Sequence, residues 1–311
     1  MPAKKKKNAG AKNTIRPKDI RAAERTSFEI SLLLRDKEFS SAEEVRSYIE
    51  NLLSSGQPFS FEKRTPIEKA QSLMYDAFEA EGAERIRLAQ EALKVSPDCA
   101  DAYVLLAEEI ANSLQEACDF YEKGMKAGER ALGENVFRED AGHFWGVITT
   151  RPYMRARAGL AQCLWMMGER KKAIEHFEDL LRLDSGDHLG LRHALIHCLI
   201  EEGLDKEALT LLDRYPEDTS ATWAYSHALL HFRQAGEGKE SDQSLQQALE
   251  VNPYIPFYLI GLWELPEELP VTIGRGDENE AIIYAVESWR SWEKTAGALE
   301  WLARVLMRRI Q

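Results

Sequence analysis

The sequence has no long apolar run and no paired cysteines. No stretch approaches the roughly 18 apolar residues that a membrane-spanning helix requires, and the N-terminus has no apolar stretch of signal-peptide type. The four cysteines stand far apart without a CxxC pair, which favours free, buried thiols in a reducing compartment over a disulfide framework: Cys99, Cys118, Cys163 and Cys198. We therefore expect a cytoplasmic protein without a membrane segment.

Signatures of common enzyme classes are also missing. The segment 134–153, where chemically active residue types gather, has no glycine-rich phosphate loop, no metal-ligand spacing and no nucleophile elbow. The sequence therefore predicts no cofactor and no enzymatic activity of these classes.

Acidic residues outnumber basic ones except at one end of the chain. The net charge is -12 over 311 residues, yet residues 1–18 hold seven Lys and Arg residues and no acid. The remaining acidic body repels nucleic-acid phosphates, so a broad nucleic-acid footprint on the folded part is not expected. We expect the tail to be solvated and disordered. RNA association through Lys4–Lys7 remains an alternative.

What the sequence does contain is a repeat. The segment GLAQCLWMMGERKKAIEHFEDLLRLDSGD places Leu160 and Ala161 before Gly168, followed by Ala173 and Phe177. This is the tetratricopeptide pattern: small residues let two antiparallel helices approach, glycine ends the first helix, and spaced large apolar residues hold the pair together.

Stepping by 34 residues divides most of the chain into five repeats. Repeats over 154–187, 188–221 and 222–255 share one phase, and repeats over 66–99 and 100–133 share another, offset by twenty residues. The predicted organisation is a disordered basic tail over 1–25, an N-terminal helical segment over 26–65, repeats 1–2 over 66–133, an inserted joint over 134–153, repeats 3–5 over 154–255, and a proline-rich loop with a C-terminal helical cap over 256–311. The fold class is therefore all-α, a tetratricopeptide-type helical-hairpin solenoid of about five repeats.

The C-terminal cap has its own signals. Asp277 and Glu280 are spaced as a capping box that starts a helix, whereas the proline-rich stretch before them disfavours one. Three tryptophans after this point, Trp289, Trp292 and Trp301, are expected to be core anchors rather than ligand contacts.

From about residue 97 onward, including the segments VNPYIPFYLIG and GRGDENEAIIYA, the chain resembles the suppression-of-tumorigenicity-seven family. It is most similar there to soluble microbial relatives described only as tetratricopeptide proteins. The resemblance implies a helical array with binding rather than catalytic duties. Animal members carry membrane-spanning segments that this chain lacks, so their membrane setting does not transfer, and the family supplies no catalytic residues.

In tetratricopeptide folds the first helix of each repeat lines a concave groove, mainly through repeat positions 2, 5, 6, 9 and 12. In this sequence those positions hold a basic, partly aromatic set in the later repeats: Arg155, Gln162, Arg192, His193, Trp223, Ser226, His227 and Arg233. The second repeat offers Asp101 and Glu108 instead. The leading hypothesis is a non-catalytic interaction scaffold whose groove binds a protein segment, with an acidic or C-terminal peptide as the candidate ligand. The alternative is a solvated face with unrelated charges.

Four histidines repeat at helical spacing. His193 and His197 lie one turn apart, and His227 and His231 repeat the pair 34 residues later. Four converging imidazoles are a possible zinc site, against which stand buried or stacked histidines. The sequence does not decide between them, and no metal is predicted.

The inserted joint collects chemically active residue types. An enzyme hypothesis makes Asp140 and His143 an acid–base pair, Thr149 or Thr150 the nucleophile and Arg151 an oxyanion clamp, giving an uncharacterised hydrolase. The structural interpretation explains more of the segment. In it, His143 and Trp145 plug the gap between the two blocks of repeats with Phe144, Val147 and Ile148, and Asp140 pairs with Arg151 or Arg157. Arg157 stands where a large apolar residue is usual, which implies a nearby carboxylate or aromatic partner.

Overall fold

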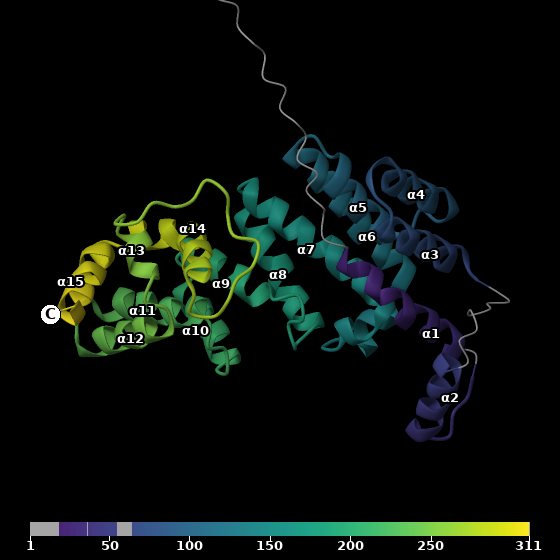
Figure 1. Cartoon of the computed structure of the whole chain (residues 1–311), viewed down its shortest axis with the longest axis horizontal. Helices are drawn as coiled ribbons and strands as arrows, with labels where there is room; N and C mark the ends of the chain where they lie inside the picture. The colour runs from purple at the N-terminus through teal and green to yellow at the C-terminus, as the bar shows by residue number, and fades with distance from the viewer. Residues whose placement is uncertain (1–18, 36, 55–63, 311) are drawn as a thin grey trace, which may run out of the picture. The chain divides into compact units, whose positions relative to one another are not determined.

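The computed structural model describes residues 19–35, 37–54 and 64–310, and within these the fold is all-α (Figure 1). Fifteen α-helices and three short 3-10 helices form the secondary structure of the described residues, where the only β-contacts are two isolated bridges to Asp184. The predicted class, a fold of consecutive helical hairpins, is confirmed.

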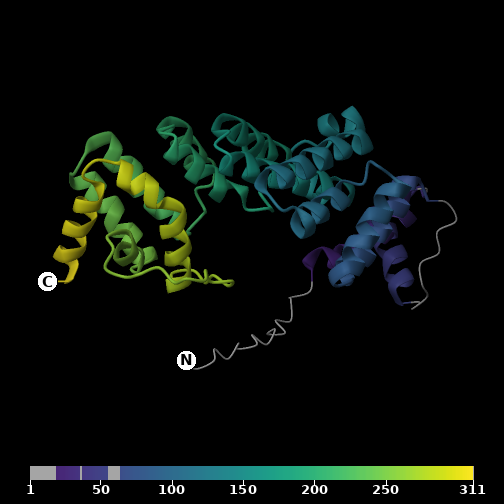
Figure 2. The same ribbon diagram turned by 90° about the horizontal axis from the view of Figure 1, so that it is seen from above.

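Each predicted repeat spans two consecutive helices. They are α3 (Pro66–Glu79) with α4 (Gly82–Val95), α5 (Ala100–Ile110) with α6 (Leu114–Glu139), α7 (Arg151–Met166) with α8 (Arg170–Leu183), α9 (Leu191–Glu201) with α10 (Asp205–Arg214), and α11 (Ala221–Ala235) with α12 (Lys239–Val251). Helices α3 and α4 pack together, as do α11 and α12 (Figure 2). Outside the repeats lie η1 (Ile20–Glu24), α1 (Arg25–Arg35) and α2 (Ala42–Ser54) before them, and α13 (Ile255–Leu259), α14 (Glu278–Lys294) and α15 (Ala298–Ile310) after them.

Local signals explain where these helices begin and end. Thr65 caps α3 in a reciprocal capping box with Glu68, and Pro66 occupies the first turn, where its missing N–H costs nothing. Gly168 after α7 has a φ of +84°, a left-handed conformation that favours glycine over any residue with a Cβ atom. The predicted cap at Asp277 is confirmed, since its carboxylate accepts from the Glu280 N–H.

The described residues fall into two compact units. The first unit takes its residues from Met1–Asn112, Phe120–Gly133 and Val147–Ala156, and the second from Ser113–Asp119, Glu134–Gly146 and Arg157–Gln311. The core of the first unit joins Phe28 of α1 to Met74, Tyr75 and Phe78 of α3 and to Leu105 of α5. The Phe28 and Tyr75 rings lie 5.3 Å apart between centroids, so α1 is anchored in this core by an aromatic contact.

In the second unit the C-terminal helices contribute large aromatic side chains to the core. Trp292 of α14 and Trp301 of α15 are fully buried and stack at 6.3 Å, as expected. Each indole N–H has a partner, Tyr284 and Asp242 respectively. Trp289 does not fit the prediction, because its side chain is 38% exposed on the outer side of α14. The proline-rich stretch also begins with a short helix, α13, which the sequence analysis did not expect.

The inserted segment 134–153 is more helical than a joint of loops. Helix α6 continues through a kink at Gly133, whose φ is +73°, and ends at Glu139. Short 3-10 helices η2 (Phe144–Gly146) and η3 (Ile148–Thr150) follow. Phe144 is fully buried against Phe137, with ring centroids 5.2 Å apart. A packed aromatic side chain therefore anchors this segment within the second unit.

Residues 19–25 differ from the prediction of an unpacked tail over 1–25. They form η1 and the start of α1, and η1 packs against α3. Asp19 and Arg21 are largely buried, with side-chain exposures of 11% and 12%. Both side chains are buried because they form ion pairs, Asp19 with Arg21 and Arg85, and Arg21 also with Glu108. The rest of the predicted tail, including Lys4–Lys7, lies outside the described residues.

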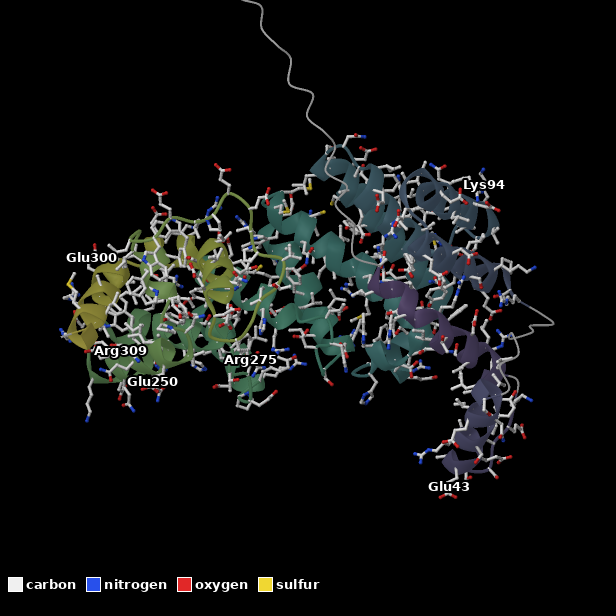
Figure 3. All side chains as sticks on the ribbon, viewed as in Figure 1. Glu43, Lys94, Glu250, Arg275, Glu300 and Arg309 are labelled. Carbon is white, nitrogen blue, oxygen red and sulfur yellow. The ribbon has the colours of Figure 1, made fainter. Side chains whose placement is uncertain are left out.

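Two further expectations concern membrane-spanning helices and thiols. None of the helices among residues 19–35, 37–54 and 64–310 is long and apolar enough to span a bilayer. The four cysteines are free and buried, as predicted. Charged side chains such as Glu43 of α2 and Lys94 of α4 project from the ribbon (Figure 3).

Candidate functional site

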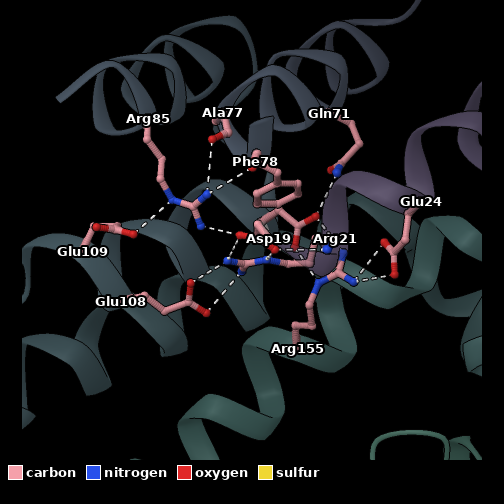
Figure 4. A network of polar contacts seen from close by, with 11 residues as sticks. Asp19, Arg21, Glu24, Gln71, Ala77, Phe78, Arg85, Glu108, Glu109 and Arg155 are labelled. Carbon is pink, nitrogen blue, oxygen red and sulfur yellow. Dashed lines mark hydrogen bonds and ion pairs between the residues drawn. The ribbon is translucent and has the colours of Figure 1, made fainter. Parts of the chain in front are cut away.

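In the first unit, three successive first helices of repeats direct polar side chains to a common site. Gln71 of α3, Asp101 and Glu108 of α5, and Arg155 of α7 occupy repeat positions 6, 2, 9 and 2, all among the positions that tetratricopeptide folds use for ligands. We call this set the first-helix face. The residues that lie against it come from η1 (Figure 4).

Asp101 is the centre of the face. Its side chain is fully buried and accepts two hydrogen bonds from Arg155, Nε to Oδ1 at 2.9 Å and Nη2 to Oδ2 at 2.8 Å. Gln71 Nε2 donates to Oδ2 at 2.8 Å. A bidentate arginine–carboxylate pair of this kind fixes orientation as well as charge. The face is therefore organised by its own residues.

Glu24, at the C-terminal end of η1, docks on the positive part of the face. Arg155 Nη1 donates to both Glu24 oxygens at 3.0 Å, and Arg151 Nη1 lies 3.1 Å from Oε1. The Glu24 side chain is 11% exposed. One carboxylate of the N-terminal segment is thus held between two guanidinium groups of α7.

Arg21 docks on the negative part of the face. Its guanidinium donates to both oxygens of Glu108, at 3.2 and 2.7 Å, and to both oxygens of Asp19, at 2.9 and 2.7 Å. The same group lies over the Phe78 ring with its Cζ atom 4.5 Å from the centroid. All three nitrogens of this guanidinium donate hydrogen bonds, and one of its faces lies against an aromatic ring.

Arg85 of α4 completes the network. It pairs with Asp19, and its Nε atom lies 3.0 Å from a Glu109 oxygen, close enough for an ion pair although without hydrogen-bond alignment. Its Nη1 atom also donates to the carbonyls of Ala77 and Phe78, both at 3.4 Å. Asp19 therefore lies between two arginines.

The electrostatics keep these groups ionised. Burial alone would raise the pKa of Asp19, but hydrogen bonds from Arg21 and Arg85 outweigh it and hold that pKa well below its usual range. Burial disfavours the charge of Arg21, yet Asp19 and Glu108 raise its pKa above the ordinary arginine value. A buried ion-pair network of this type contributes more to specific docking geometry than to net stability.

Of the eight basic, polar and aromatic groove residues that were predicted, Arg155 belongs to the first unit and the other seven belong to the second unit. Gln162 of α7 is exposed. Arg192 of α9 donates to Asp218 at 2.7 Å and to Asp187 at 2.9 Å, and His193 Nε2 lies 2.9 Å from the same Asp218 oxygen. Burial opposes ionisation of Asp218, but hydrogen bonds from His193, Ser220 and Arg192 hold its pKa far below normal.

On α11 the predicted groove residues are less accessible than expected. Trp223 and Ser226 are buried, and Trp223 packs against His193 with 5.3 Å between ring centroids. Arg233 is tied to its neighbours, donating to Asp205 at 2.8 Å and to the carbonyls of Ile200 and Ser291. Its charge is therefore used within the fold rather than offered to a ligand.

The four histidines have separate partners. His193 pairs with Asp218, His197 lies 3.1 Å from Glu287, and His231 meets Ser244 at 3.1 Å. The His227 ring lies near that of His231, with centroids 5.9 Å apart and the two ring planes tilted by 50°. Over the part of the chain that the structure describes, no three His, Cys, Asp or Glu side chains are grouped to hold a metal ion.

The candidate residues of the inserted segment are divided between the units. In the second unit, the His143 ring is exposed, Trp145 is half-buried, and the His143 backbone N–H donates to the Asp140 carbonyl at 2.9 Å. Arg151 belongs to the first unit and pairs with Glu24. Arg157 pairs with Asp179 of α8 rather than with Asp140, and its Nε atom donates to His176 Nδ1 at 3.1 Å. Thr150 is buried and its hydroxyl donates to the Val147 carbonyl.

Comparison with known proteins identifies the family of this chain. A family model described as ST7 protein matches residues 43–309. The chain belongs to the ST7 protein family. This confirms the resemblance drawn from the NPYIP and GDENEA segments.

The ST7 relatives described next are longer than this chain. The "Protein ST7 homolog" of Caenorhabditis elegans is 29% identical over 270 residues, covering 73% of this chain and 48% of the relative. The Drosophila melanogaster homolog is 29% identical over 249 residues, covering 70% and 45%. The Homo sapiens "Suppressor of tumorigenicity 7 protein-like" is 28% identical over 245 residues, covering 70% and 42%. The chain spans about half the length of these ST7 relatives or less.

Among solved structures, the ST7-family chain is similar to one titled "Crystal structure of YrrB: a TPR protein with an unusual peptide-binding site". The TM-score is 0.40 at 17% identity, covering 71% of this chain and 91% of that chain.

Proposed function

We propose that this ST7-family chain is a non-catalytic scaffold that binds a segment of a partner protein on the faces formed by the first helices of its repeats. One observation carries the proposal. The first-helix face of the first unit already holds a short helical segment, η1, through Glu24 on Arg155 and Arg21 on Glu108. A surface that binds η1 by charge-assisted hydrogen bonds has the chemistry needed to bind a peptide.

An acidic peptide is not part of this proposal. Arg192 lies between Asp187 and Asp218, and Arg233 is paired with Asp205, so neither arginine presents an unbalanced positive charge. A ligand that carries charges of both signs fits these faces better than a uniformly acidic one.

The contacts within the inserted segment 134–153 do not favour a catalytic role for it. The hydroxyl of Thr150, a candidate nucleophile, belongs to a buried side chain and donates to the Val147 carbonyl at 2.7 Å, so it is engaged within the fold. The buried aromatic contact of Phe144 with Phe137 instead supports a structural role for the segment.

The test uses one substitution at two exposed glutamines. Gln162→Arg adds a bulky charge on a first helix, α7, and Gln247→Arg adds the same group on a second helix, α12. Proteins captured from the native source by the unmodified chain are compared with those captured by each variant, and any prey is then titrated as a purified protein. We expect Gln162→Arg to weaken the partner by about tenfold or more, while Gln247→Arg has no effect. Equal capture by all three chains would refute the proposal.

A further inference from the structure

The position of residues 19–35 is that of a ligand rather than of a terminal cap. A cap covers the outermost helix of a repeat array, because only that helix lacks a neighbour. Residues of η1 instead contact three successive first helices: η1 packs on α3, Arg21 meets Glu108 of α5, and Glu24 meets Arg155 of α7. The segment therefore crosses the repeats as a bound peptide does (Figure 4).

The apolar contribution of this segment is small. Phe28 is the only fully buried side chain of η1 and α1, and Ile20 is 86% exposed. Helix α2, which follows, has no buried residue. Structural helices owe most of their stability to a buried apolar face, whereas in this segment Ala22 and Leu32 are only partly buried against the core. A segment held in this way is suited to exchange.

The first-helix face and the residues beside it provide a distinct set of partners for a ligand; those beside it are Arg151 of α7, Phe78 and Tyr75 of α3, and Arg85 of α4. Arg155 and Arg151 hold a carboxylate, Glu108 together with the Phe78 ring holds a guanidinium, and Arg85 holds a second carboxylate. Tyr75 offers an aromatic contact to a ring one helical turn further along. The native occupant meets all four through Asp19, Arg21, Glu24 and Phe28.

We propose that the first-helix face of the first unit is a binding site for a helical segment of a partner protein, and that residues 19–35 fill this site in cis. The partner segment carries the pattern of the cis occupant: a carboxylate, an arginine two residues later, a second carboxylate three residues further and an aromatic residue four residues beyond. This inference rests on the proposed function and names the ligand class and the competitor at one of its faces.

The experiment separates the segment from its site within the full chain. The triple variant Arg21→Ala/Glu24→Ala/Phe28→Ala removes three of the four contacts named above, keeps the ion pair of Asp19 with Arg85, and leaves the first-helix face unchanged. The probe is a labelled peptide with the sequence of residues 19–35, and binding is measured by fluorescence anisotropy. We expect the triple variant to bind the peptide at least about tenfold more tightly than the unmodified chain, in which the tethered segment competes.

A matched peptide tests the recognition chemistry. Exchanging Arg21 and Glu24 within the peptide keeps its composition and length but places a carboxylate opposite Glu108 and a guanidinium opposite Arg155. We expect this peptide to bind the triple variant at least about tenfold more weakly than the native peptide, because both contacts become repulsive. Equal binding of the two peptides, or no binding of the native peptide to the folded variant, would overturn the inference.

Two further measurements could contradict the inference. If the triple variant does not fold, the segment is an integral part of the unit and the inference is wrong. Hydrogen exchange on the unmodified chain checks this independently, since amides of η1 and α1 must exchange by local opening, faster than those of α5. A dimer of the unmodified chain that is lost in the triple variant would assign the site to a second copy and overturn the choice of a different protein.

The two proposals fail in different ways. Loss of capture with Gln162→Arg together with no peptide binding to the triple variant would leave the scaffold function in place and remove only the cis ligand. Peptide binding to the triple variant, without any effect of Gln162→Arg on capture, would leave the cis ligand in place and remove the scaffold function.

Discussion

The buried carboxylate of Asp101 gives the sharpest stability test, through Asp101→Asn. The substitution keeps the shape of the side chain but removes its charge and turns one of its two acceptor atoms into a donor. In the native structure both oxygens accept from Arg155, and Oδ2 also accepts from Gln71. The asparagine amide group must therefore face a donor, whichever way it is oriented.

The expected loss follows from burial. Removing one partner of a buried ion pair typically costs about 3–5 kcal/mol, because the other charge is left without compensation. Glu24 still accepts from Arg155 in the variant, so the lower end of that range applies and we expect about 3 kcal/mol. For a unit of this size the loss lowers the melting temperature by about 10 °C.

Asp98→Asn is the matched control in the same unit. Asp98 pairs with Arg130 at 2.7 Å, but the two side chains are 35% and 55% exposed, and exposed pairs contribute at most about 1 kcal/mol. Unfolding is followed by circular dichroism in urea, with hydrogen exchange of α5 to assign the transition to the first unit, because a chain with two units need not unfold in one step. Equal losses for the two variants would refute the central role of Asp101.

Further predictions concern the second unit. Phe144→Ala is expected to cost about 3–4 kcal/mol in urea unfolding, because the ring is fully buried, whereas His143→Ala should cost less than about 0.5 kcal/mol because its ring is exposed; a larger loss at His143 would contradict this assignment. Asp218 has a folded pKa below its unfolded value of about 3.8, so its stabilisation is present above about pH 4 and disappears as the pH falls further. The difference in unfolding free energy between the native chain and Asp218→Asn should therefore shrink between pH 5 and pH 3, and a constant difference would count against the pairing with Arg192 and His193. Burial and the neighbouring His231 lower the pKa of His227 below 6.5, so the unfolded chain binds the extra proton and stability falls as the pH drops through 6.5. His227→Gln should reduce the loss of stability between pH 7.5 and 5.5, and an unchanged pH profile would show that His227 is not responsible.

The helical hairpins were predictable because their signals are local. Gly168 at the end of α7, with Ala173 and Phe177 at fixed distances after it, reports helix ends and helix contacts within one repeat. Such patterns depend only on short sequence separations, which is why the helix pairs fall on the predicted repeats. That Arg157 has a partner was predictable, since a charge at an apolar position requires one, but the partner is Asp179 and not the expected Asp140.

Docking of η1 was not predictable in the same way. Its segment, DIRAAE, has no apolar period, and its contacts reach Glu108 and Arg155 across 87 and 131 positions of the chain. A charged residue in an acidic chain has many potential partners, and sequence alone does not rank them. The predicted groove residues show the same limit. Arg192 was assigned to the correct helix, but the two aspartates that neutralise it come from loops, whose positions depend on the tertiary fold.

A tethered occupant changes what the first-helix face selects. A segment held on the same chain acts at an effective concentration of the order of millimolar, so a partner that only reproduces its contacts cannot displace it at micromolar concentration. A successful partner must add contacts that residues 19–35 lack. The structure shows where such contacts are absent: Ile20 points to solvent, and Phe28 is the only fully buried side chain of η1 and α1. A partner segment with the same charges and a second buried apolar residue would therefore bind, whereas segments with the charges alone would be excluded. In this way, competition from the cis segment makes the first-helix face selective among partner segments.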